Sequence, residues 1–144
     1  MSIVSQTTEY ALRAIVCLSQ HAQNEQGQVL TAPFIAEQTK VPAGYLVKVL
    51  QNMCRAGLVK SQRGIGGGFR LACDPRKTTI YDVVVAVDEL PRIIVCPLGN
   101  PLHTKLCPLH QRIDTAMESV EVAFKKTCIA ELVDTQDPLC MVGK

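Results

Sequence analysis

The 144-residue sequence contains no tryptophan, and aromatic residues make up only 4% of it. With so few large rings available, the hydrophobic core must be built mainly from Leu, Val, Ile and Ala. Hydrophobic residues still account for 47% of the chain and charged residues for 19%, which is typical of a globular protein and excludes a disordered tail. The length is close to that of a single domain.

The sequence also lacks any apolar run near the roughly 20 residues that a membrane-spanning helix needs. Its first residues, MSIVSQTTEY, do not have the basic and then apolar order of a signal peptide. We therefore expect a cytoplasmic protein with no membrane partner. Stable disulfides are uncommon in that compartment, so clustered cysteines are more often metal ligands or redox groups.

No nucleophile motif, phosphate-binding loop or substrate-pocket signature stands out in the sequence. The glycines of RGIGGG are followed by FRLAC, which alternates like a strand, whereas Rossmann and P-loop glycines open into a helix. Glu9 and two histidines could be posed as an acid–base set, but nothing supplies a nucleophile or a substrate. The sequence therefore predicts that the protein is not an enzyme.

Helical patterning dominates the first part of the chain. Apolar residues recur at helical spacing in residues 7–22, in the segment that Thr31 can cap, and in residues 45–55. A short turn at KVPAG separates the last two helices, which is the skeleton of a helix-turn-helix as well as of an ordinary helical hairpin. In a helix-turn-helix the second helix enters the major groove, and its N-terminal residues meet the base edges. Those residues are Ala43, Gly44, Tyr45 and Lys48.

A β-hairpin is predicted directly after this motif. LVKSQ and FRLAC have strand character, and RGIGGG between them forms a flexible turn. Such a hairpin after a helix-turn-helix is a wing, whose tip can lie along the DNA backbone with an arginine in a narrow minor groove. The predicted DNA-binding residues of the wing are Lys60, Arg63, Gly64, Gly66, Gly67 and Arg70.

Positive charge is concentrated in the middle of the chain. Residues 31–77 carry eight Lys or Arg and only two acidic residues, although the whole chain has a net charge of just +2. A basic middle between acidic flanks indicates one face for a polyanion such as double-stranded DNA. An acidic protein partner on the same face is the alternative.

The second half of the sequence predicts one shorter and one longer helix. Residues 80–90 form a helix that Thr78 or Thr79 can cap, and a proline-rich linker follows. A long helix then begins at about Lys105, with Pro108 in its first turn. Its apolar residues repeat at spacings of three and four, as in a dimer seam, and a homodimer would suit a palindromic operator. The seam residues are Leu106, Leu109, Ile113, Ala116, Val120 and Ala123.

These patterns together predict a mainly α fold with a small β-hairpin. The fold is a winged helix-turn-helix followed by a long C-terminal dimerisation helix. We expect a DNA-binding domain over residues 1–90 and a Cys/His sensor loop over 91–104. The dimerisation helix should then span 105–127, and a C-terminal tail 128–144.

Seven cysteines are present, an odd number that speaks against a fully paired disulfide framework. Cys17, Cys54 and Cys73 sit inside apolar patterns and are interpreted as small core residues. Cys128 and Cys140 have no partner at ligand spacing.

The remaining cysteines lie in residues 96–110, CPLGNPLHTKLCPLH, which also hold two of the three histidines. Thiolates bind soft and borderline metals, and imidazole accepts iron or zinc. The candidate metal ligands Cys96, His103, Cys107 and His110 therefore suit zinc, or a [2Fe–2S] cluster of mixed ligation. A thiol–disulfide switch between Cys96 and Cys107, or a loop with no sensing role, are the alternatives.

The sequence resembles the Rrf-type winged-helix regulators, a family that includes IscR, NsrR and CymR. The resemblance is carried by EYALRAI, IAEQTKVPAGYLVKVLQNMCRAGLVKSQRGIGGGFRLA and TIYDVVVAVDE, and covers roughly residues 3–130. It implies a homodimeric, sequence-specific DNA-binding repressor or activator. It also implies that Tyr45 lies in the recognition helix and that Arg63 reaches the minor groove. Val47 stands where IscR has a glutamate, so the base preference is not implied.

The resemblance also bears on the cysteine loop. Cluster-binding members resemble IscR in having three cysteines with five residues between each, and a histidine three positions after the last. Cys107 and His110 match the closing pair and Cys96 lies near the first cysteine, but the middle cysteine is missing and His103 is the only nearby substitute. In NsrR-like members an acidic residue of the first helix reaches the cluster from the partner subunit, and Glu9 matches that position.

We therefore expect a DNA-binding transcriptional regulator, acting as a repressor, whose activity responds to this loop. The implied cofactor is an iron–sulfur cluster of the [2Fe–2S] type, with zinc or no metal as alternatives. The alternative functions are a metal-free thiol-switch regulator and a protein-interaction module that uses the basic face.

Overall fold

The computed structural model describes residues 3–22, 28–102 and 104–133. As predicted, the fold is mainly helical, with a two-stranded antiparallel hairpin and a long C-terminal helix. None of the described helices is both long and apolar enough to cross a membrane. The elements in chain order are α1 (Gln6–Ala22), α2 (Ala32–Thr39), α3 (Ala43–Arg55), β1 (Val59–Gln62), β2 (Gly68–Leu71), α4 (Ile80–Val87), α5 (Pro108–Lys126) and α6 (Ile129–Val133).

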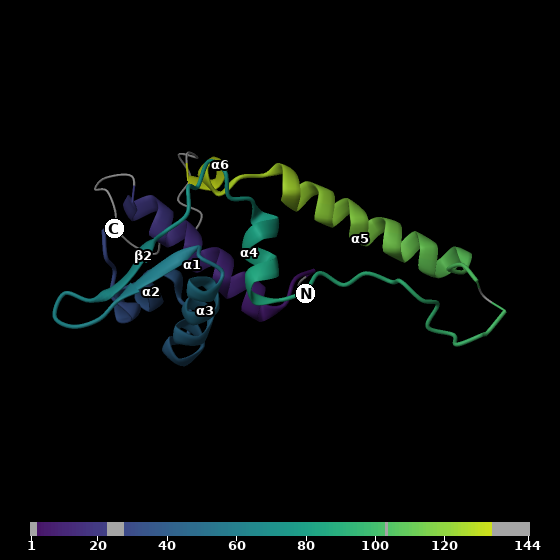
Figure 1. Ribbon diagram of the computed structural model, residues 1–144, viewed down its shortest axis with the longest axis horizontal. Coiled ribbons are helices and arrows are strands. Elements are labelled where there is room, and N and C mark those ends of the chain that lie inside the picture. The colour runs from purple at the N-terminus through teal and green to yellow at the C-terminus, as the bar shows by residue number, and fades with distance from the viewer. Residues whose placement is uncertain (1–2, 23–27, 103, 134–144) are drawn as a thin grey trace.

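The chain forms one packed body from which α5 projects. Figure 1 shows α1 to α4, the hairpin and α6 gathered together, while the linker after α4 runs outward from this body and α5 returns beside it. The centre of the body is α1, which packs against α2, α3, α4 and α6. Ala11 and Ala14 are fully buried on it, and their small side chains let the neighbouring helices approach closely.

The helix-turn-helix follows from local signals that the sequence displays. Thr31 caps α2 as predicted, because its hydroxyl accepts a hydrogen bond from the backbone nitrogen of Phe34 at 3.3 Å. Lys40 then takes a left-handed conformation (φ 57°), and Pro42 precedes the first residue of α3. Gly57, with φ 79°, terminates α3 and confirms the predicted helix end.

The hairpin is tied to the body by a third extended segment. Leu30 and Phe69 exchange two backbone hydrogen bonds of 2.8 Å, so the chain before α2 pairs with the outer edge of β2. Gly68 lies at this contact with φ 153°, and a Cβ atom there would collide with the carbonyl of Leu30. The glycine-rich turn was predicted to be a flexible tip, but Gly68 is also required for this close approach.

The later helices are shorter than the sequence predicts. Thr79 caps α4 in a reciprocal capping box with Asp82, but the helix ends at Val87 instead of Leu90. Asp88 is extended there, and its carboxylate accepts hydrogen bonds from the backbone nitrogen of Glu89 at 2.8 Å and the Thr8 hydroxyl at 3.5 Å. Hydrogen bonds hold the pKa of Asp88 below its usual value: the Ser5 side chain has the largest effect, and the Glu89 nitrogen and the Thr8 hydroxyl add to it.

Helix α5 begins at Pro108, three residues after the predicted start at Lys105. Cys107 is extended (φ −65°, ψ 162°) and occupies the N-cap position, which leaves the preceding residues in the linker. The proline is therefore the first helical residue, where its missing N–H costs nothing.

Candidate nucleic-acid interface and metal centre

One face of α3 is buried and the other is presented to solvent. The predicted base-reading residues Ala43, Gly44, Tyr45 and Lys48 are all exposed. Apolar side chains at helical spacing anchor the opposite face in the core, which leaves the exposed residues free for a groove of DNA. The anchoring residues are Leu46, Val49, Leu50 and Met53.

Tyr45 is positioned by an aromatic contact that the sequence did not predict. Its ring meets the ring of Tyr10 edge-on, with centroids 6.1 Å apart, and Tyr45 remains 58% exposed. Tyr10 is itself fixed, since Gln6 Nε2 donates to its hydroxyl at 2.7 Å and the Arg13 guanidinium lies 5.9 Å from its ring centre. Helix α1 therefore sets the direction of the Tyr45 side chain.

The wing presents its predicted residues on the surface. Lys60, Arg63, Gly64, Gly66 and Arg70 are exposed and Gly67 is half-buried. The ion pairs among the described residues involve only Arg13, Arg92 and Lys125 as cations, so none neutralises the lysine or the arginines of the wing. Uncommitted cations next to an exposed helix can neutralise DNA phosphates.

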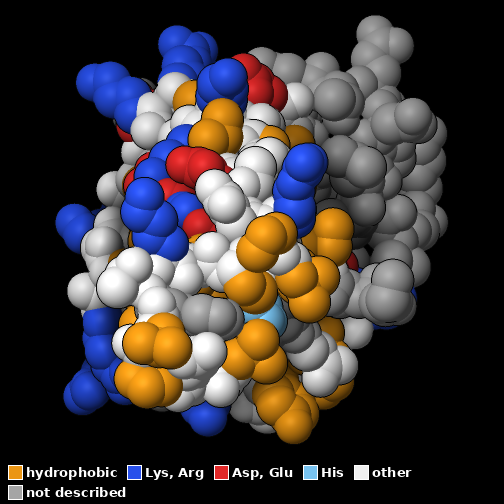
Figure 2. All heavy atoms as spheres, turned by 90° about the vertical axis from the view of Figure 1, so that its right-hand side faces the viewer, with side chains coloured by type: hydrophobic (Ala, Val, Ile, Leu, Met, Phe, Trp, Pro, Cys, Tyr) orange, Lys and Arg blue, Asp and Glu red, His pale blue; other side chains and the backbone are white. Residues whose placement is uncertain are grey.

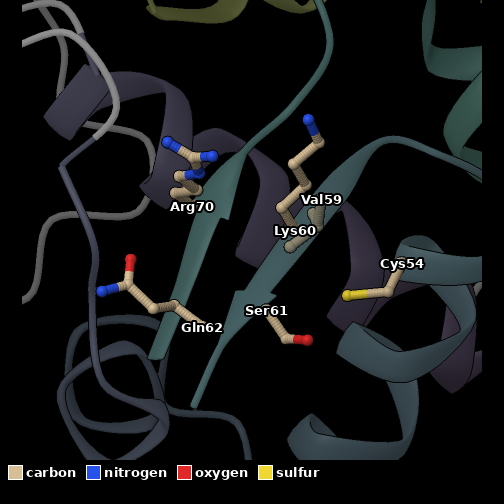
Figure 3. A pocket seen from close by; sticks show the side chains of 6 residues that line it. All are labelled: Cys54, Val59, Lys60, Ser61, Gln62 and Arg70. Carbon is tan, nitrogen blue, oxygen red and sulfur yellow. The ribbon is translucent and has the colours of Figure 1, made fainter. Parts of the chain in front are cut away.

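An open cavity of about 380 Å³ lies between the end of α3 and the hairpin (Figure 3). Lys60 and Arg70 stand directly opposite each other in the strand register, so two positive charges share one face of the hairpin. Cys54 forms the α3 side of the cavity, and burial raises the pKa of its thiol. The thiol is therefore uncharged at neutral pH. The charged side chains that line the cavity are both positive, which favours the binding of an anion.

A second group of functional side chains lies at the opposite end of the molecule. Cys107 Sγ is 2.9 Å from His110 Nδ1, and Cys96 Sγ is 3.8 Å from the same nitrogen. The three donor atoms lie within 4.8 Å of one another, and Cys96 is buried although it belongs to a loop. Cys96 and Cys107 are not joined by a disulfide.

The start of α5 brings these residues together. Cys107 at the N-cap and His110 three residues later lie on the same side of the first helical turn. Cys96 reaches them from the linker, where Gly99 donates to the Cys96 carbonyl at 3.2 Å and turns the chain with φ 64°. The structure therefore brings both predicted cysteines together with one of the two predicted histidines.

The linker is fastened to α5 by Arg92, which the sequence did not predict. Arg92 Nε and Nη2 donate to the two carboxylate oxygens of Asp114 at 2.8 and 2.9 Å, and Nη1 donates to Glu121 at 3.1 Å. The Ile93 backbone nitrogen also donates to Asp114, at 2.9 Å. Hydrogen bonds from Arg92, the largest cause, lower the pKa of Asp114 to about 2. We call Arg92, Asp114 and Glu121 the linker clamp.

The contacts of the linker clamp continue towards the packed body. Lys125 Nζ lies 2.6 Å from the Glu121 carboxylate and 4.5 Å from the centre of the Tyr81 ring. Tyr81 belongs to α4, which packs against α1 and α3. A continuous set of contacts therefore runs from the linker through α5 to the helices that carry the predicted DNA-binding residues.

Two further ligands were predicted, His103 and Glu9. His103 lies outside the described residues. Glu9 is in α1, where its carboxylate pairs with Arg13 at 3.1 Å. Figure 1 shows α1 in the packed body and the start of α5 at the far end of the molecule, so Glu9 does not reach the group within its own chain.

The donor chemistry fits a metal centre with one further ligand. Zinc sites and the irons of Fe–S clusters are held by thiolates and imidazoles, in sets of four for a closed zinc site or a whole cluster. Cys96, Cys107 and His110 supply three such ligands. The fourth must come from beyond this group, from another part of the chain, a second subunit or solvent.

Large apolar side chains are exposed around this end of the molecule. Figure 2 shows them gathered on the face that looks along α5 towards the packed body. They come from the linker and from the first turns of α5. The most exposed are Ile94, Val95, Leu98, Leu102 and Leu109.

Comparison with known proteins adds to this geometry. Residues 4–135 match the family described as "Rrf2: Iron-dependent Transcriptional regulator". A protein of Aquifex aeolicus (strain VF5), assigned as an HTH-type transcriptional regulator, is 28% identical over 94% of each chain.

Solved structures share the fold at lower sequence identity. T. potens IscR superimposes with a TM-score of 0.75 and 23% identity, over 98% of this chain and 93% of that one. The global cysteine regulator CymR of B. subtilis also gives a TM-score of 0.75 and 23% identity, over 95% of this chain and 100% of that one.

Proposed function

This chain belongs to the Rrf2 family of DNA-binding transcriptional regulators, and we propose that it is a repressor whose operator affinity is set by a metal centre on Cys96, Cys107 and His110. The family is one of transcriptional regulators and not of enzymes. We further propose that the centre is an iron–sulfur cluster, with [2Fe–2S] as the type that suits mixed thiolate and imidazole ligation. The observation that carries this proposal is the convergence of the three donor atoms at the start of α5.

On the DNA side, the proposal assigns α3 to the major groove and the wing to the phosphate backbone and minor groove. It is supported by the exposure of the predicted residues and by the absence of ion-pair partners for the wing cations among the described residues. The assigned residues are Ala43, Gly44, Tyr45, Lys48, Lys60, Arg63, Gly64, Gly66, Gly67 and Arg70.

On the signal side, a bound centre would join the linker to the first turn of α5 by metal–ligand bonds that oxidation or metal loss can break. The protein's own residues carry the consequence. The linker clamp holds the linker along α5, and the contact between Lys125 and Tyr81 couples the position of α5 to that of α4. A change at the Cys/His group would thus alter the placement of α3.

We also propose that the protein is a homodimer that binds a palindromic operator. None of the α5 residues is buried, so this helix lacks the packing of an apolar face that supplies most helix stability in proteins. A second copy of α5 would cover its exposed apolar residues, including Leu109 and Ile113. Twofold symmetry would then place two recognition helices one DNA turn apart, at roughly 34 Å.

The decisive experiment is purification without oxygen, followed by analysis of iron, sulfide and zinc and by DNA-binding measurements before and after metal removal. We expect equimolar iron and sulfide, broad absorption in the visible range, and DNA affinity that changes on removal. Cys107→Ala should abolish metal binding, whereas Cys128→Ser, at a cysteine outside the group, should retain it.

Other results would contradict parts of the proposal. Colourless protein containing zinc would replace the cluster with a zinc site. Metal-free protein whose DNA binding responds to oxidant would favour a thiol switch. Protein that binds no duplex DNA at low salt would overturn the regulator assignment in favour of a protein-interaction module.

A further inference from the structure

The outer face of α3 is organised as a stripe that extends beyond its N-terminal residues. At about 100° per residue, Gly44, Lys48 and Gln51 fall on the side directly opposite the buried residues of the helix. Val47 borders this stripe and is 37% exposed, whereas Tyr45 lies at the other border, against Tyr10. We call Gly44, Val47, Lys48 and Gln51 the reading stripe.

Gly44 is not explained by the fold of the chain. Its φ is not positive, and a Cβ atom added to it would meet no other atom within 4 Å. Glycine within a helix costs about 0.5–1 kcal/mol relative to alanine, so nothing in the protein itself favours it there. A glycine does, however, let another molecule approach the helix backbone closely, and Gly44 would allow this at the N-terminal end of the reading stripe.

The polar side chains of the reading stripe are uncommitted. Lys48 and Gln51 make no hydrogen bond or ion pair with any described residue, whereas Arg55 in the next turn donates to Asn52 at 2.9 Å. A glutamine amide presents one donor and one acceptor, which together match the N6 and N7 atoms of adenine. An exposed apolar side chain such as Val47 matches the methyl group of thymine.

The spacing of the reading stripe is that of a known base-reading face. Its members stand at positions i, i+3, i+4 and i+7, which is the spacing of the base-contacting residues in the recognition helix of homeodomains. We infer that Gln51 is a specificity-determining residue that reads an adenine, that Val47 contacts a thymine methyl, and that Gly44 marks the closest approach of α3 to DNA. This inference rests on the proposed function and deepens it, because it predicts A·T pairs in each half-site.

The test begins with selection of binding sites from a random duplex pool by the full-length wild-type protein. Selection is repeated with Gln51→Ala and with Gln28→Ala, an exposed glutamine before α2. We expect Gln51→Ala to lose discrimination at one base pair per half-site by about tenfold or more, with an unchanged salt dependence, because glutamine carries no charge. Gln28→Ala should select the wild-type sequence.

Modified duplexes then identify the atoms. Replacing the selected adenine by 7-deazaadenine should weaken binding of the wild type and have no further effect on Gln51→Ala. Replacing thymine by uracil should likewise weaken the wild type, and should weaken Val47→Ala less, because alanine has a smaller apolar side chain. Circular dichroism checks that the variants are folded.

Two outcomes separate the inference from the proposed function. If Gln51→Ala is folded and selects the wild-type sequence with the wild-type preference at every position, the inference is overturned and the regulator assignment stands. If the wild-type protein binds duplex DNA with no sequence preference, or not at all, the proposed function fails and the inference fails with it.

Discussion

At the scale of single residues, the protein uses its cations in two different ways. Arg92 is saturated by Asp114 and Glu121, and hydrogen bonds to these carboxylates raise the pKa of its guanidinium further. Arg63 and Arg70 have no carboxylate partner among the described residues and lie exposed on the wing. Arginine side chains therefore form ion pairs that hold the linker at one end of the molecule, and other arginines remain available to bind phosphate at the other end.

Replacing Arg63 by glutamine should weaken DNA binding without changing stability, because the exposed guanidinium makes no ion pair within the described chain. We expect the slope of log affinity against log salt to fall by about 1, the value for one lost phosphate contact. Fluorescence anisotropy with a labelled operator between low and moderate salt measures this slope. Lys126→Gln, at the end of α5, is the matched control, and an unchanged Arg63→Gln slope would remove Arg63 from the interface.

At the scale of elements, the hairpin depends on the chain that precedes α2. The two hydrogen bonds between Leu30 and Phe69 add a third extended segment to β1 and β2. A two-stranded hairpin alone is marginally stable, so this pairing helps to hold the wing in a fixed direction. The pairing exists only because Gly68 has no side chain at the contact.

Gly68→Ala should destabilise the protein by more than about 1 kcal/mol, since alanine is strained at φ 153° and its Cβ would meet the Leu30 carbonyl. Chemical denaturation monitored by circular dichroism gives the free energy of unfolding. Gly44→Ala is the matched control, because it has open space in a helix and should leave that free energy unchanged or raise it. Equal stability of the two variants would contradict the role given to Gly68.

The linker clamp is the second element-scale device, and it predicts a pH dependence. The pKa of Asp114 is lowered to about 2, so the pair with Arg92 stabilises the folded chain above pH 4. That stabilisation is lost as the pH falls from about 4 towards 2, where Asp114 takes up a proton.

Hydrogen exchange of the Ile93 amide, which donates to Asp114, should report this change. We expect protection from exchange to be constant at pH 5 and above and to decrease below about pH 4, after correction for the intrinsic exchange rate. Asp114→Ala should be unprotected at every pH. Persistent protection of that amide in Asp114→Ala would show that the clamp does not hold the linker.

At the scale of the whole molecule, α5 stands out because it contributes no buried residue to the hydrophobic core. It projects from the packed body (Figure 1), and Leu109, Ile113 and Val122 are exposed on it within the single chain. The hydrophobic effect favours covering such a surface, and a second copy related by twofold symmetry offers the same residues in return.

Ile113→Glu should convert the proposed dimer into a monomer, because it places a charge in the middle of the apolar seam. Sedimentation velocity measures the oligomeric state, and the DNA affinity for a palindromic site should fall with it. Thr115→Glu places the same charge on the opposite side of α5, so it should remain dimeric. A wild-type protein that sediments as a monomer would contradict the proposal that the apolar seam of α5 is a dimer interface.

Much of the fold could be read from short-range patterns. The Thr31 cap, the Gly57 helix end and the apolar spacing of α3 are determined by neighbours within one or two turns, and the structure confirms them. The three-residue spacing of Cys107 and His110 is likewise a local feature, which one turn of α5 brings together. Helix ends depend on contacts from elsewhere, which is why α4 stops early at Asp88, where the carboxylate accepts from Thr8.

By itself, then, the sequence determined the type and order of the elements from α1 to α5 and the chemistry of the candidate ligands, because periodicity, caps and ligand types act locally. It did not predict α6, which lies in the expected C-terminal tail and packs against α1. Only the tertiary structure decided which distant residues meet. It brought Cys96 to Cys107 and His110, joined Arg92 to Asp114, and set Tyr45 against Tyr10. Those contacts depend on how helices pack and where loops return, and packing is settled by the whole core at once.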